Sequence, residues 1–466
     1  MPFLDAAEIA GWTGGKWENA CPPCAIAGVC HDTRRLSRGR LYIALRGPRF
    51  DGHDFVRDAA ASGACGAVVE TNFPISAANP GFPLLRVTNT HAALRAMAQG
   101  WLKKQSPLVI GVTGSAGKST VKDLISAILS VNKRVAASQG NWNNDIGLPL
   151  SILEMEAGTE ILVLELGTNH PGELARLCGM ARPHWGVVTQ VGPSHLEFFG
   201  SVEGVAAEKA VLLESLPAEG RAFVRADIEH AGRLVRHVRC PVVRAAMSGE
   251  ADYVCLRRDK TRMEIEERST GQRAVMPLPL PGEHQAANLL LAAAVARAAG
   301  IGWEDISRGL DGYRPAEMRW QTELVGRITV VNDAYNANPL SMAAAIRTFR
   351  EMDGISGRKW LALGDMLELG NQAEAEHAAA GRLVASLGGW AGLVAVGRFA
   401  AIAADSAVAA PAGPGCGIVI KAGDSVEAAE KLAKLLQPGD AVLVKGSRGM
   451  RMERIVAKLR EIVSDR

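Results

Sequence analysis

The residues whose types and spacing most clearly suit a chemical function lie between Leu108 and Thr120, in the sequence LVIGVTGSAGKST. An apolar run is followed by a turn with glycines at 114 and 117, and then by a lysine and two hydroxyl residues that open a predicted helix. Glycine tolerates the backbone angles that let successive amide N–H groups face one anion, and a helix start adds the positive end of its dipole. The pattern predicts a nucleotide-phosphate site.

Within this turn, Lys118 is placed to reach the β- and γ-phosphates and the Ser119 hydroxyl to hold magnesium. The usual phosphate-loop spacing has a further glycine where this chain has Val112, so the pattern indicates one branch of ATP-using proteins. A glycine-rich turn can be only a turn, but here the strand, the Gly-Lys-Ser-Thr run and the helix occur in the required order. The predicted nucleotide-binding residues are Thr113, Gly114, Ser115, Ala116, Gly117, Lys118, Ser119 and Thr120.

Polar side chains also follow the next predicted buried strands, ILVLELG at 161–167 and WGVVTQVG at 185–192. In open parallel sheets ligands bind beyond the carboxyl ends of the strands, so we expect these ends to converge on the phosphate loop. Glu165 offers the hard oxygen that magnesium prefers. His195 follows the second strand; a lone histidine is usually structural, but this position favours a site residue.

Three further segments of this region allow both functional and ordinary interpretations. The loop GNWNNDIGLP contains Asn143 and Asn144, which fit either substrate contacts or side-chain-stabilised turns. Lys209 lies in the helical run VEGVAAEKAVLLE, where a solvated lysine is the ordinary interpretation. His284 and Asn288 are four residues apart and share a face if their helix begins early.

From Pro315 onward the alternation of strands and helices begins again. The run ITVVNDAYNANPLSM predicts a strand that ends near Asp333, followed by a polar turn. Lys445 and Arg448 follow a later strand and suit anionic groups. This region therefore predicts a second nucleotide-type α/β unit, with helices expected at about 374–387, 425–436 and 450–463.

The first hundred residues also alternate short strands and helices, with strands predicted at 41–45 and 66–70. The segment His31–Phe55 includes a charged, glycine-rich loop after the first of these strands, which fits a polar ligand and a solvated loop equally well. Alternating strands and helices therefore run through three successive regions, at residues 1–103, 104–313 and 314–466, and predict the α/β class.

Length and composition exclude several classes of protein. A chain of 466 residues is expected to form two to four domains. Lys and Arg number 52 against 49 Asp and Glu, a net charge of +3 that argues against nucleic acid or an anionic membrane surface as partner. The first residues lack the order of a signal peptide, and no apolar run approaches the roughly 18 residues of a membrane-spanning helix. We therefore expect a soluble cytoplasmic protein.

The eight cysteines are scattered, which fits reduced thiols better than a disulfide framework. Cys21 and Cys24 form CPPC, with Cys30 and His31 nearby, so a zinc or redox site is an alternative. No second CxxC completes a zinc set, and we expect a loop with incidental thiols.

Nine motifs, in colinear order over nearly the whole chain, resemble those of the Mur ligase family. They are GVTGSAGKST, NNDIGLP, ELGTNHPGEL, HLEFFGS, EKAVLLE, GEHQAAN, NDAYNANPLSM, LGDMLELG and VLVKGSRGM. YNANP, LGDMLELG and KGSRGM are more similar to the branch that adds D-alanyl-D-alanine. The resemblance implies an N-terminal domain for the UDP-substrate, a central P-loop ATPase with a mostly parallel sheet, and a C-terminal Rossmann-like domain that closes over the site.

The resemblance also implies roles for individual residues, matched by motif. The implied catalytic residues are Lys118, Lys209, His195 and Asn336. The implied metal ligands are Ser119, Glu165, His195 and Lys209, and the further nucleotide contacts are Asn288, Arg319 and Asp333. The expected substrate contacts are Asp32, Thr33, Arg34, Asp51, Gly52, His53, Asn143, Asn144, Lys445 and Arg448.

The implied reaction consumes ATP with two magnesium ions. The terminal carboxylate of UDP-MurNAc-tripeptide attacks the γ-phosphate, and the amine of D-alanyl-D-alanine attacks the acyl phosphate to give UDP-MurNAc-pentapeptide for peptidoglycan synthesis. Lys209 matches a lysine that carries a carbamate in such enzymes, which requires a neutral amine that meets carbon dioxide. We expect a monomer.

Three departures from the family pattern concern the surroundings of the adenine: Gln190 and Gln285 replace frequent asparagines, and Met318 stands where glycine is common. Two alternatives stay open. One is a ligase of the same fold that adds another amino acid, or glutamate to a folate. The other is a nucleotide-binding scaffold without turnover, which the presence of Lys118 and His195 disfavours.

Overall fold

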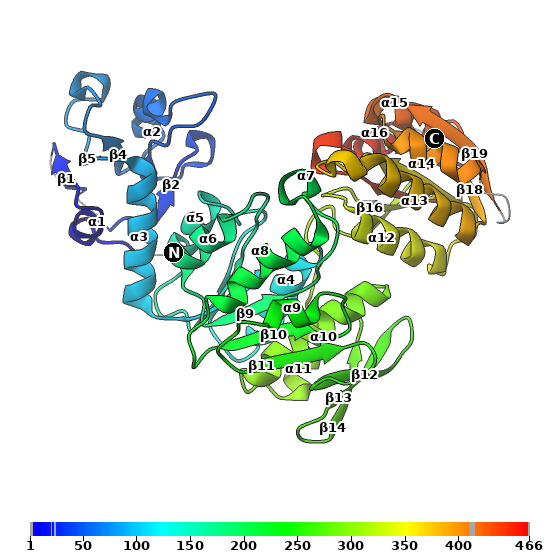
Figure 1. The fold of residues 1–466 in the computed structure, drawn as a ribbon. Coiled ribbons are helices and arrows are strands. Elements are labelled where there is room, and N and C mark those ends of the chain that lie inside the picture. Colours follow the sequence, from blue (N-terminus) through cyan, green and yellow to red (C-terminus); the bar gives the residue numbers. More distant parts are fainter. Residues whose placement is uncertain (1–2, 20, 23–24, 410–414, 465–466) are drawn as a thin grey trace.

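The computed structural model describes residues 3–464, except 20, 23–24 and 410–414. Cys24 of the CPPC pair therefore lies outside the described residues, while Cys21 is exposed. Three sheets of five, nine and six strands follow one another along the chain (Figure 1). The predicted α/β class with three sheet-bearing domains is confirmed, whereas the domain boundaries stay predictions.

The N-terminal domain is a five-stranded sheet of order β1-β5-β4-β3-β2, in which β1 is antiparallel and the other pairs are parallel. Two short 3-10 helices, η1 and η2, carry the residues predicted to bind the UDP-substrate. The elements are α1 Ala6–Thr13, β1 Lys16–Glu18, β2 Val29–Cys30, η1 Thr33–Arg35, β3 Leu41–Ile43, η2 Gly52–Phe55, α2 Val56–Ala61, β4 Gly66–Glu70, η3 Ile75–Ala77 and β5 Leu84–Val87.

Helix α3 (Thr90–Gln105) connects this domain to the central one and packs against α5 (Gly147–Leu153). Its N-cap is Asn89, whose side chain accepts from the Ala92 amide at 2.8 Å. Trp101 is fully buried, and its indole N–H donates to the Met155 carbonyl at 3.0 Å. The predicted boundary after residue 103 falls within the last turn of this helix.

The central domain has a nine-stranded sheet of order β14-β13-β12-β11-β10-β9-β6-β8-β7. Strands β6 to β12 pair in parallel, while β12, β13 and β14 form an antiparallel meander at one edge. The elements are β6 Leu108–Thr113, α4 Lys118–Leu129, β7 Val135–Ala137, α5, β8 Ile161–Glu165, α6 Glu173–Ala181, β9 Trp185–Val188, α7 Leu196–Phe199, α8 Val202–Glu214, β10 Arg221–Arg225, α9 Ala231–Val235, β11 Val242–Ala246, β12 Tyr253–Arg258, β13 Arg262–Glu267, β14 Gln272–Pro277, α10 Glu283–Ala298 and α11 Trp303–Asp311.

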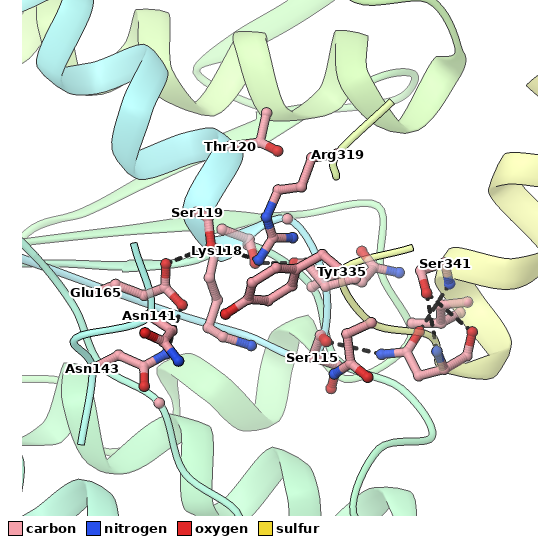
Figure 2. Close-up of a pocket in the computed structure, with 18 of the residues that line it drawn as sticks. Ser115, Lys118, Ser119, Thr120, Asn141, Asn143, Glu165, Arg319, Tyr335 and Ser341 are labelled. Carbon is pink, nitrogen blue, oxygen red and sulfur yellow. Dashed lines mark hydrogen bonds between the residues drawn. The ribbon is translucent and has the colours of Figure 1, made fainter. Parts of the chain in front are cut away.

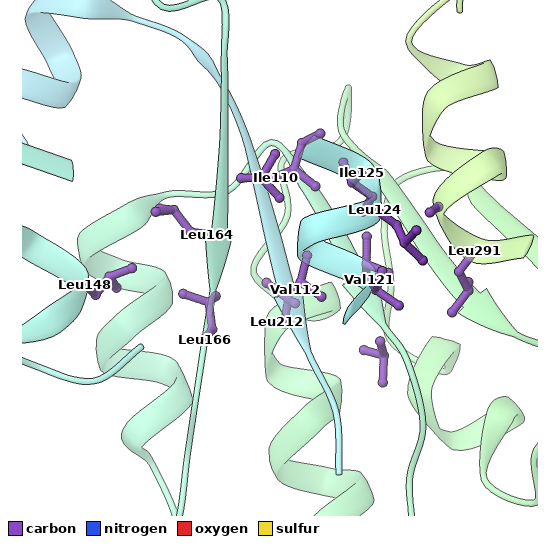
Figure 3. Packing of buried hydrophobic residues seen from close by; sticks show 14 of the residues in the cluster. Ile110, Val112, Val121, Leu124, Ile125, Leu148, Leu164, Leu166, Leu212 and Leu291 are labelled. Atoms are coloured by element: carbon purple, nitrogen blue, oxygen red, sulfur yellow. The ribbon is translucent and has the colours of Figure 1, made fainter. Parts of the chain in front are cut away.

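Strand β6 is an interior strand of this sheet and is apolar because both of its faces are covered (Figure 3). Ile110 and Val112 are fully buried, in one core with Leu124 of α4 and Leu212 of α8. Val112, which stands where the usual phosphate-loop spacing has glycine, is therefore a core residue of the strand and lies before the turn. The loop is shorter than the usual one because the strand continues to Thr113.

The C-terminal domain has a six-stranded sheet of order β15-β16-β20-β17-β18-β19, parallel except for β15. The three predicted helices are present, with ends that differ by up to three residues from the prediction. The elements are β15 Gln321–Val325, β16 Ile328–Asp333, α12 Pro339–Glu351, β17 Lys359–Gly364, η4 Gly370–Gln372, α13 Ala373–Leu387, β18 Trp390–Val396, α14 Ala400–Ala409, β19 Cys416–Ala422, α15 Ser425–Ala433, β20 Ala441–Lys445, η5 Arg448–Met450 and α16 Glu453–Ser464. Among the described residues, no helix is long and apolar enough to cross a membrane.

Candidate active site

A cavity of about 730 Å³ lies where the central and C-terminal domains meet. Its walls come from the carboxyl ends of β8 and β10, the loops after β6 and β9, the start of α4, the first turn of α10, and the turn between β16 and α12. The predicted convergence of strand ends on the phosphate loop is therefore present, and the C-terminal domain supplies the facing wall.

Residues 114–119, here called the phosphate loop, need glycine at both predicted positions. Gly114 has φ +150° and Gly117 has φ +82°. A Cβ atom on Gly114 would lie 2.1 Å from Thr189 Oγ1, and one on Gly117 would lie 2.5 Å from Asn288 Oδ1. The backbone thus approaches its neighbours more closely than a side chain would allow.

Hydrogen bonds to neighbouring segments fix the phosphate loop but leave two of its backbone amides without an acceptor in the described chain. The Ser115 amide donates to the Gln190 carbonyl at 2.8 Å, and Thr189 Oγ1 donates to the Ala116 carbonyl at 2.5 Å. Within the described chain, the amides of Ala116 and Gly117 have no acceptor. Helix α4 begins immediately afterwards at Lys118. Free amides next to a helix start form an anion-binding concavity.

Lys118 projects back over this loop, and its Nζ donates to the Gly114 carbonyl at 2.6 Å. Burial lowers the pKa of Lys118, with Glu165 opposing this shift and Arg319 adding to it. A carbonyl is a weaker partner for an ammonium group than a phosphate, so an anion in the cavity would compete well for this lysine.

Ser119 links the two domains at the centre of the cavity (Figure 2). Its hydroxyl donates to Glu165 Oε2 at 2.6 Å and accepts from Arg319 Nη2 at 2.9 Å. The other carboxylate oxygen of Glu165 accepts from Asn143 Nδ2 at 2.8 Å. The hydroxyl of α4, the carboxylate of β8 and the guanidinium that follows the central domain are thereby held in one network.

This network suits magnesium. The described residues contain no cluster of three His, Cys, Asp or Glu side chains that could enclose a metal. Magnesium, however, keeps several waters and is commonly held by one or two protein oxygens together with substrate phosphates. A serine hydroxyl hydrogen-bonded to a carboxylate beside a phosphate loop meets that requirement.

His195 also lines the cavity, and it touches the C-terminal domain. Its Nδ1 contacts the carboxylate of Glu368, and the hydrogen bond from His195 lowers the pKa of that carboxyl. Both residues have left-handed backbone angles, φ +50° for His195 and φ +62° for Glu368. The Glu197 amide adds a second link by donating to the Glu368 carbonyl at 3.2 Å.

Lys209 is buried within α8, with 1% of its surface exposed, so the interpretation as a solvated lysine is wrong. Its pKa lies well below the ordinary value because it is buried and because Lys118 is close, while Glu208 and Glu173 act in the opposite direction. Lys209 lies behind the cavity wall rather than in it. The neighbouring Glu208 fixes that wall by accepting from the Gly172 amide at 2.9 Å and the Leu174 amide at 2.8 Å.

The predicted nucleotide contacts Asn288, Arg319 and Asp333 all line the cavity. Helix α10 begins at Glu283, so the condition for His284 and Asn288 to share a face is met, and His284 lines the cavity too. Burial lowers the pKa of His284 to about 4, which keeps the imidazole neutral. Lys445 holds Asp333 in place. Its Nζ donates to Asp333 Oδ2 at 2.6 Å and to the Asn336 carbonyl at 3.1 Å.

Arg319 lies in a linker whose neighbouring residues have unusual backbone angles. Met318 has φ +58° and Trp320 has φ +50°, values that bulky residues rarely adopt. The Trp320 amide donates to Asp333 Oδ1 at 3.1 Å, and the Tyr335 amide donates to the Met318 carbonyl at 3.1 Å. The guanidinium of Arg319 lies 4.2 Å from the centre of the Tyr335 ring, which fixes its plane (Figure 2).

The remaining predicted catalytic and substrate residues of these two domains differ in their position relative to the cavity. Asn143, Asn144, Asn336 and Lys445 line the cavity, but Arg448 does not; it is exposed, and its guanidinium lies 3.4 Å from Glu453. Their roles stay predictions.

In the N-terminal domain, Asp51 and His53 line a second cavity of about 490 Å³, together with Arg46, Arg57 and Phe73. Gly52 lies between them, where a Cβ atom would be 2.6 Å from the Leu45 amide. Asp32, Thr33 and Arg34 line neither cavity, and Arg34 pairs with Asp32 at 2.8 Å.

Several residues of the main cavity were not predicted individually. They come from segments that the sequence had singled out, by strand ends or by motif, and their signal is that position: Thr168, Asn169, His170, Glu173, Arg225, Tyr335 and Asn338. Asn141 lies in the amide-rich loop and was also missed.

Comparison with known proteins agrees with this geometry. Three family models match successive parts of the chain: the Mur ligase family catalytic domain at residues 25–101, the Mur ligase middle domain at 112–296, and the Mur ligase glutamate ligase domain at 318–448. The chain belongs to the Mur ligase family.

Individual relatives cover almost the whole molecule. The UDP-N-acetylmuramoyl-tripeptide–D-alanyl-D-alanine ligase of Bacillus subtilis is 35% identical over 94% of this chain and 93% of its own. A crystal structure of MurF from Acinetobacter baumannii superposes with a TM-score of 0.86 at 28% identity, covering 99% of this chain and 100% of that one. MurF ligase from Thermotoga maritima, solved in complex with ADP, gives a TM-score of 0.77 at 26% identity, covering 94% and 98%.

Proposed function

We propose that this Mur ligase joins D-alanyl-D-alanine to UDP-MurNAc-tripeptide at the expense of ATP, giving UDP-MurNAc-pentapeptide for peptidoglycan synthesis. The observation that carries the proposal is the network in which Ser119 of the phosphate loop binds Glu165 and Arg319 within a single cavity. The name of the Bacillus subtilis relative, which matches over more than nine tenths of both chains, supports these two substrates within the family.

The first chemical step activates a carboxyl group. A terminal carboxylate oxygen of the tripeptide forms a bond to the γ-phosphorus of ATP, the bond from that phosphorus to the β-γ bridging oxygen breaks, and ADP leaves. Lys118 and Arg319 both line the cavity and supply positive charge where negative charge collects. The free amides of Ala116 and Gly117 add hydrogen bonds to the phosphates.

The second step forms the amide. The neutral amine of D-alanyl-D-alanine attacks the acyl carbon, the nitrogen gives up its proton, and inorganic phosphate leaves with the pair of electrons of the broken C–O bond. The acyl phosphate would also react with water, so the cavity must be closed while it exists. The contacts of Arg319 with Ser119 and of Glu368 with His195 hold the C-terminal domain against the central domain in this way.

Magnesium fits this site, and Ser119, Glu165 and His195 would hold it. When bound, it would withdraw electron density from the phosphate oxygens and reduce the repulsion between them and the attacking carboxylate. Asn143 would keep the carboxylate of Glu165 oriented through the hydrogen bond that it already makes.

The depressed pKa of Lys209 supports its assignment as a carbamate. A neutral Nζ would form a bond to the carbon of carbon dioxide and release one proton, which leaves an anionic N-carboxylate. This anion would be a ligand for a second magnesium ion. Burial next to the charge of Lys118 favours the neutral amine that this chemistry needs.

The N-terminal domain would bind the UDP end of the first substrate. Asp51 and His53 lie in its cavity beside Arg46 and Arg57, whose charges suit a diphosphate. The same proposal has the ligase acting as a monomer in the cytoplasm, which size-exclusion chromatography and fractionation of the producing cells would test.

An acceptor comparison tests the assignment directly. Purified protein is given ATP, magnesium and UDP-MurNAc-tripeptide, with lysine or diaminopimelate as third residue, and then D-alanyl-D-alanine, D-glutamate or a single diamino acid. We expect phosphate release and a product heavier by one dialanyl unit only with D-alanyl-D-alanine. Equal phosphate release with the other acceptors, or with a folate and glutamate, would refute the proposal.

A further inference from the structure

The turn between β16 and α12 meets the phosphate loop through one side chain. Asn338 Nδ2 donates to the Ser115 carbonyl at 2.9 Å, across 223 residues of sequence. Both residues line the main cavity, and Ser115 is labelled in Figure 2. The contact joins the C-terminal domain to the loop that is proposed to bind the phosphates of ATP.

The orientation of this amide is determined by its other partner. Asn338 is the N-cap of α12, and its Oδ1 accepts from the Ser341 amide at 2.9 Å. Ser341 Oγ in turn accepts from the Asn338 amide at 3.0 Å, which completes a capping box. Because the oxygen is occupied by the helix, the nitrogen must face the Ser115 carbonyl.

The turn that carries Asn338 is held by its own domain and packed against the central one. Ser447 Oγ donates to the Ala337 carbonyl at 3.2 Å, and Lys445 donates to the Asn336 carbonyl at 3.1 Å. In the first turn of α12, Leu340 packs so closely on Gly192 that a Cβ atom there would lie 2.3 Å from Leu340 Cδ1. The side chain of Asn338 therefore has a fixed position relative to the C-terminal sheet.

The bond to Ser115 has a consequence for the next amide. In a planar trans peptide the carbonyl and the following N–H point in opposite directions, so the Ser115 carbonyl and the Ala116 N–H turn together. The other polar groups of Ser115 are already taken, its amide by Gln190 and its hydroxyl by Gly192 and Ser194. Asn338 is what holds the remaining carbonyl, and the Ala116 N–H is one of the loop amides without an acceptor in the described chain.

We propose that Asn338 is a positioning residue for nucleotide binding: docking of the C-terminal domain sets the Ser115–Ala116 peptide plane and thereby aims the Ala116 N–H at a phosphate. This inference rests on the proposed function only for the nucleotide, and it does not depend on which acceptor is used. The phosphate loop then has its nucleotide-binding geometry only when α12 is docked against it.

Asn338→Ser tests this inference because serine is also a good N-cap but is too short to reach Ser115. The affinity of the Asn338→Ser variant for a non-hydrolysable ATP analogue, measured by calorimetry, should be about fivefold lower than that of the wild type, which is the effect of one lost hydrogen bond. In turnover, KM for ATP should rise by a similar factor while KM for UDP-MurNAc-tripeptide stays unchanged.

Ser341→Ala is the matched control. It removes the hydroxyl half of the capping box and leaves the Asn338–Ser115 bond, so the melting temperature should fall while affinity for the ATP analogue is retained. Asn338→Asp, which keeps the cap but places an acceptor against a carbonyl, should weaken analogue binding at least as much as Asn338→Ser. Wild-type analogue affinity in Asn338→Ser, or equal losses in Asn338→Ser and Ser341→Ala, would overturn the inference. Failure of the acceptor assignment would instead show as normal analogue binding without ligation.

Discussion

The two cavities of this molecule differ in how their walls are assembled. The N-terminal cavity is built from residues 46–77, which one small sheet brings together. The main cavity joins residues hundreds of positions apart, since Arg319 reaches Ser119 and Glu368 reaches His195 from another domain. The first can therefore hold its ligand whatever the position of the C-terminal domain, whereas the second exists only when two domains meet.

Lys118 provides the strongest test of this difference. Lys118→Ala should lower kcat at least about a hundredfold, because a half-buried cation is lost where phosphate charge is expected to collect. Binding of UDP-MurNAc-tripeptide, followed by calorimetry, should be retained because the site proposed for it lies in the N-terminal domain. Lys133→Ala, at an exposed lysine paired with Glu160, is the control and should leave kcat unchanged. An equal effect of both variants would contradict the assignment of Lys118.

Lys209 tests whether the main cavity needs a modified residue. Lys209→Ala should lower turnover about a hundredfold or more, and a small carboxylate such as acetate should restore part of it by replacing the lost anion. Protein equilibrated with ¹³C-bicarbonate should show one carbamate signal that Lys209→Arg lacks. Lys122, whose amine donates to the Ser138 carbonyl at 2.6 Å, is a buried internal comparison and should stay unlabelled. Full activity of Lys209→Ala would refute the carbamate.

The N-terminal cavity should respond in the opposite way. Arg46→Ala removes a cation from its wall, so KM for UDP-MurNAc-tripeptide should rise about tenfold through the loss of a charge-assisted hydrogen bond. KM for ATP should not change. Arg49→Ala, at an exposed neighbouring position, is the control. If Arg46→Ala alters KM for ATP instead, the two cavities are not independent.

The smallest effect concerns His284 at the junction of the domains. Burial lowers its pKa to about 4, whereas an unfolded histidine titrates near 6.5. Between these values the unfolded chain binds a proton that the folded chain does not, so acidification favours unfolding. Stability should fall by on the order of 1 kcal/mol between about pH 7 and pH 5, since His284 is not completely shielded from water. Melting curves of His284→Gln should show a weaker pH dependence; an identical dependence would contradict this origin.

The sequence predicted the features of the site that are encoded locally. The phosphate loop and the position of Glu165 at a strand end depend on neighbouring residues and on strand polarity, and both are present. Only the family resemblance indicated that Lys209 is not a solvated lysine, because the sequence of its helix is that of an ordinary amphipathic helix. The helix instead packs between the sheet and the loop held by Glu208.

What the sequence did not predict depends on contacts between distant segments. The antiparallel β12–β14 meander was missed because alternating strands and helices dominate the rest of the domain. Arg448 looked suited to an anion, yet it turns to Glu453 and to Met318 Sδ. The links made by Arg319 and Asn338 require the C-terminal domain to lie against the phosphate loop, which no local pattern specifies.

The left-handed angles of Met318 and Trp320 are maintained from within the C-terminal domain. Each costs on the order of 1 to 2 kcal/mol relative to ordinary backbone, and hydrogen bonds with Tyr335 and Asp333 offset this cost. Because this segment leads directly into β15, which pairs with β16, Arg319 is attached to the C-terminal sheet and moves with it. Any separation of the two domains would therefore carry the arginine away from Ser119 without a rearrangement of its own backbone.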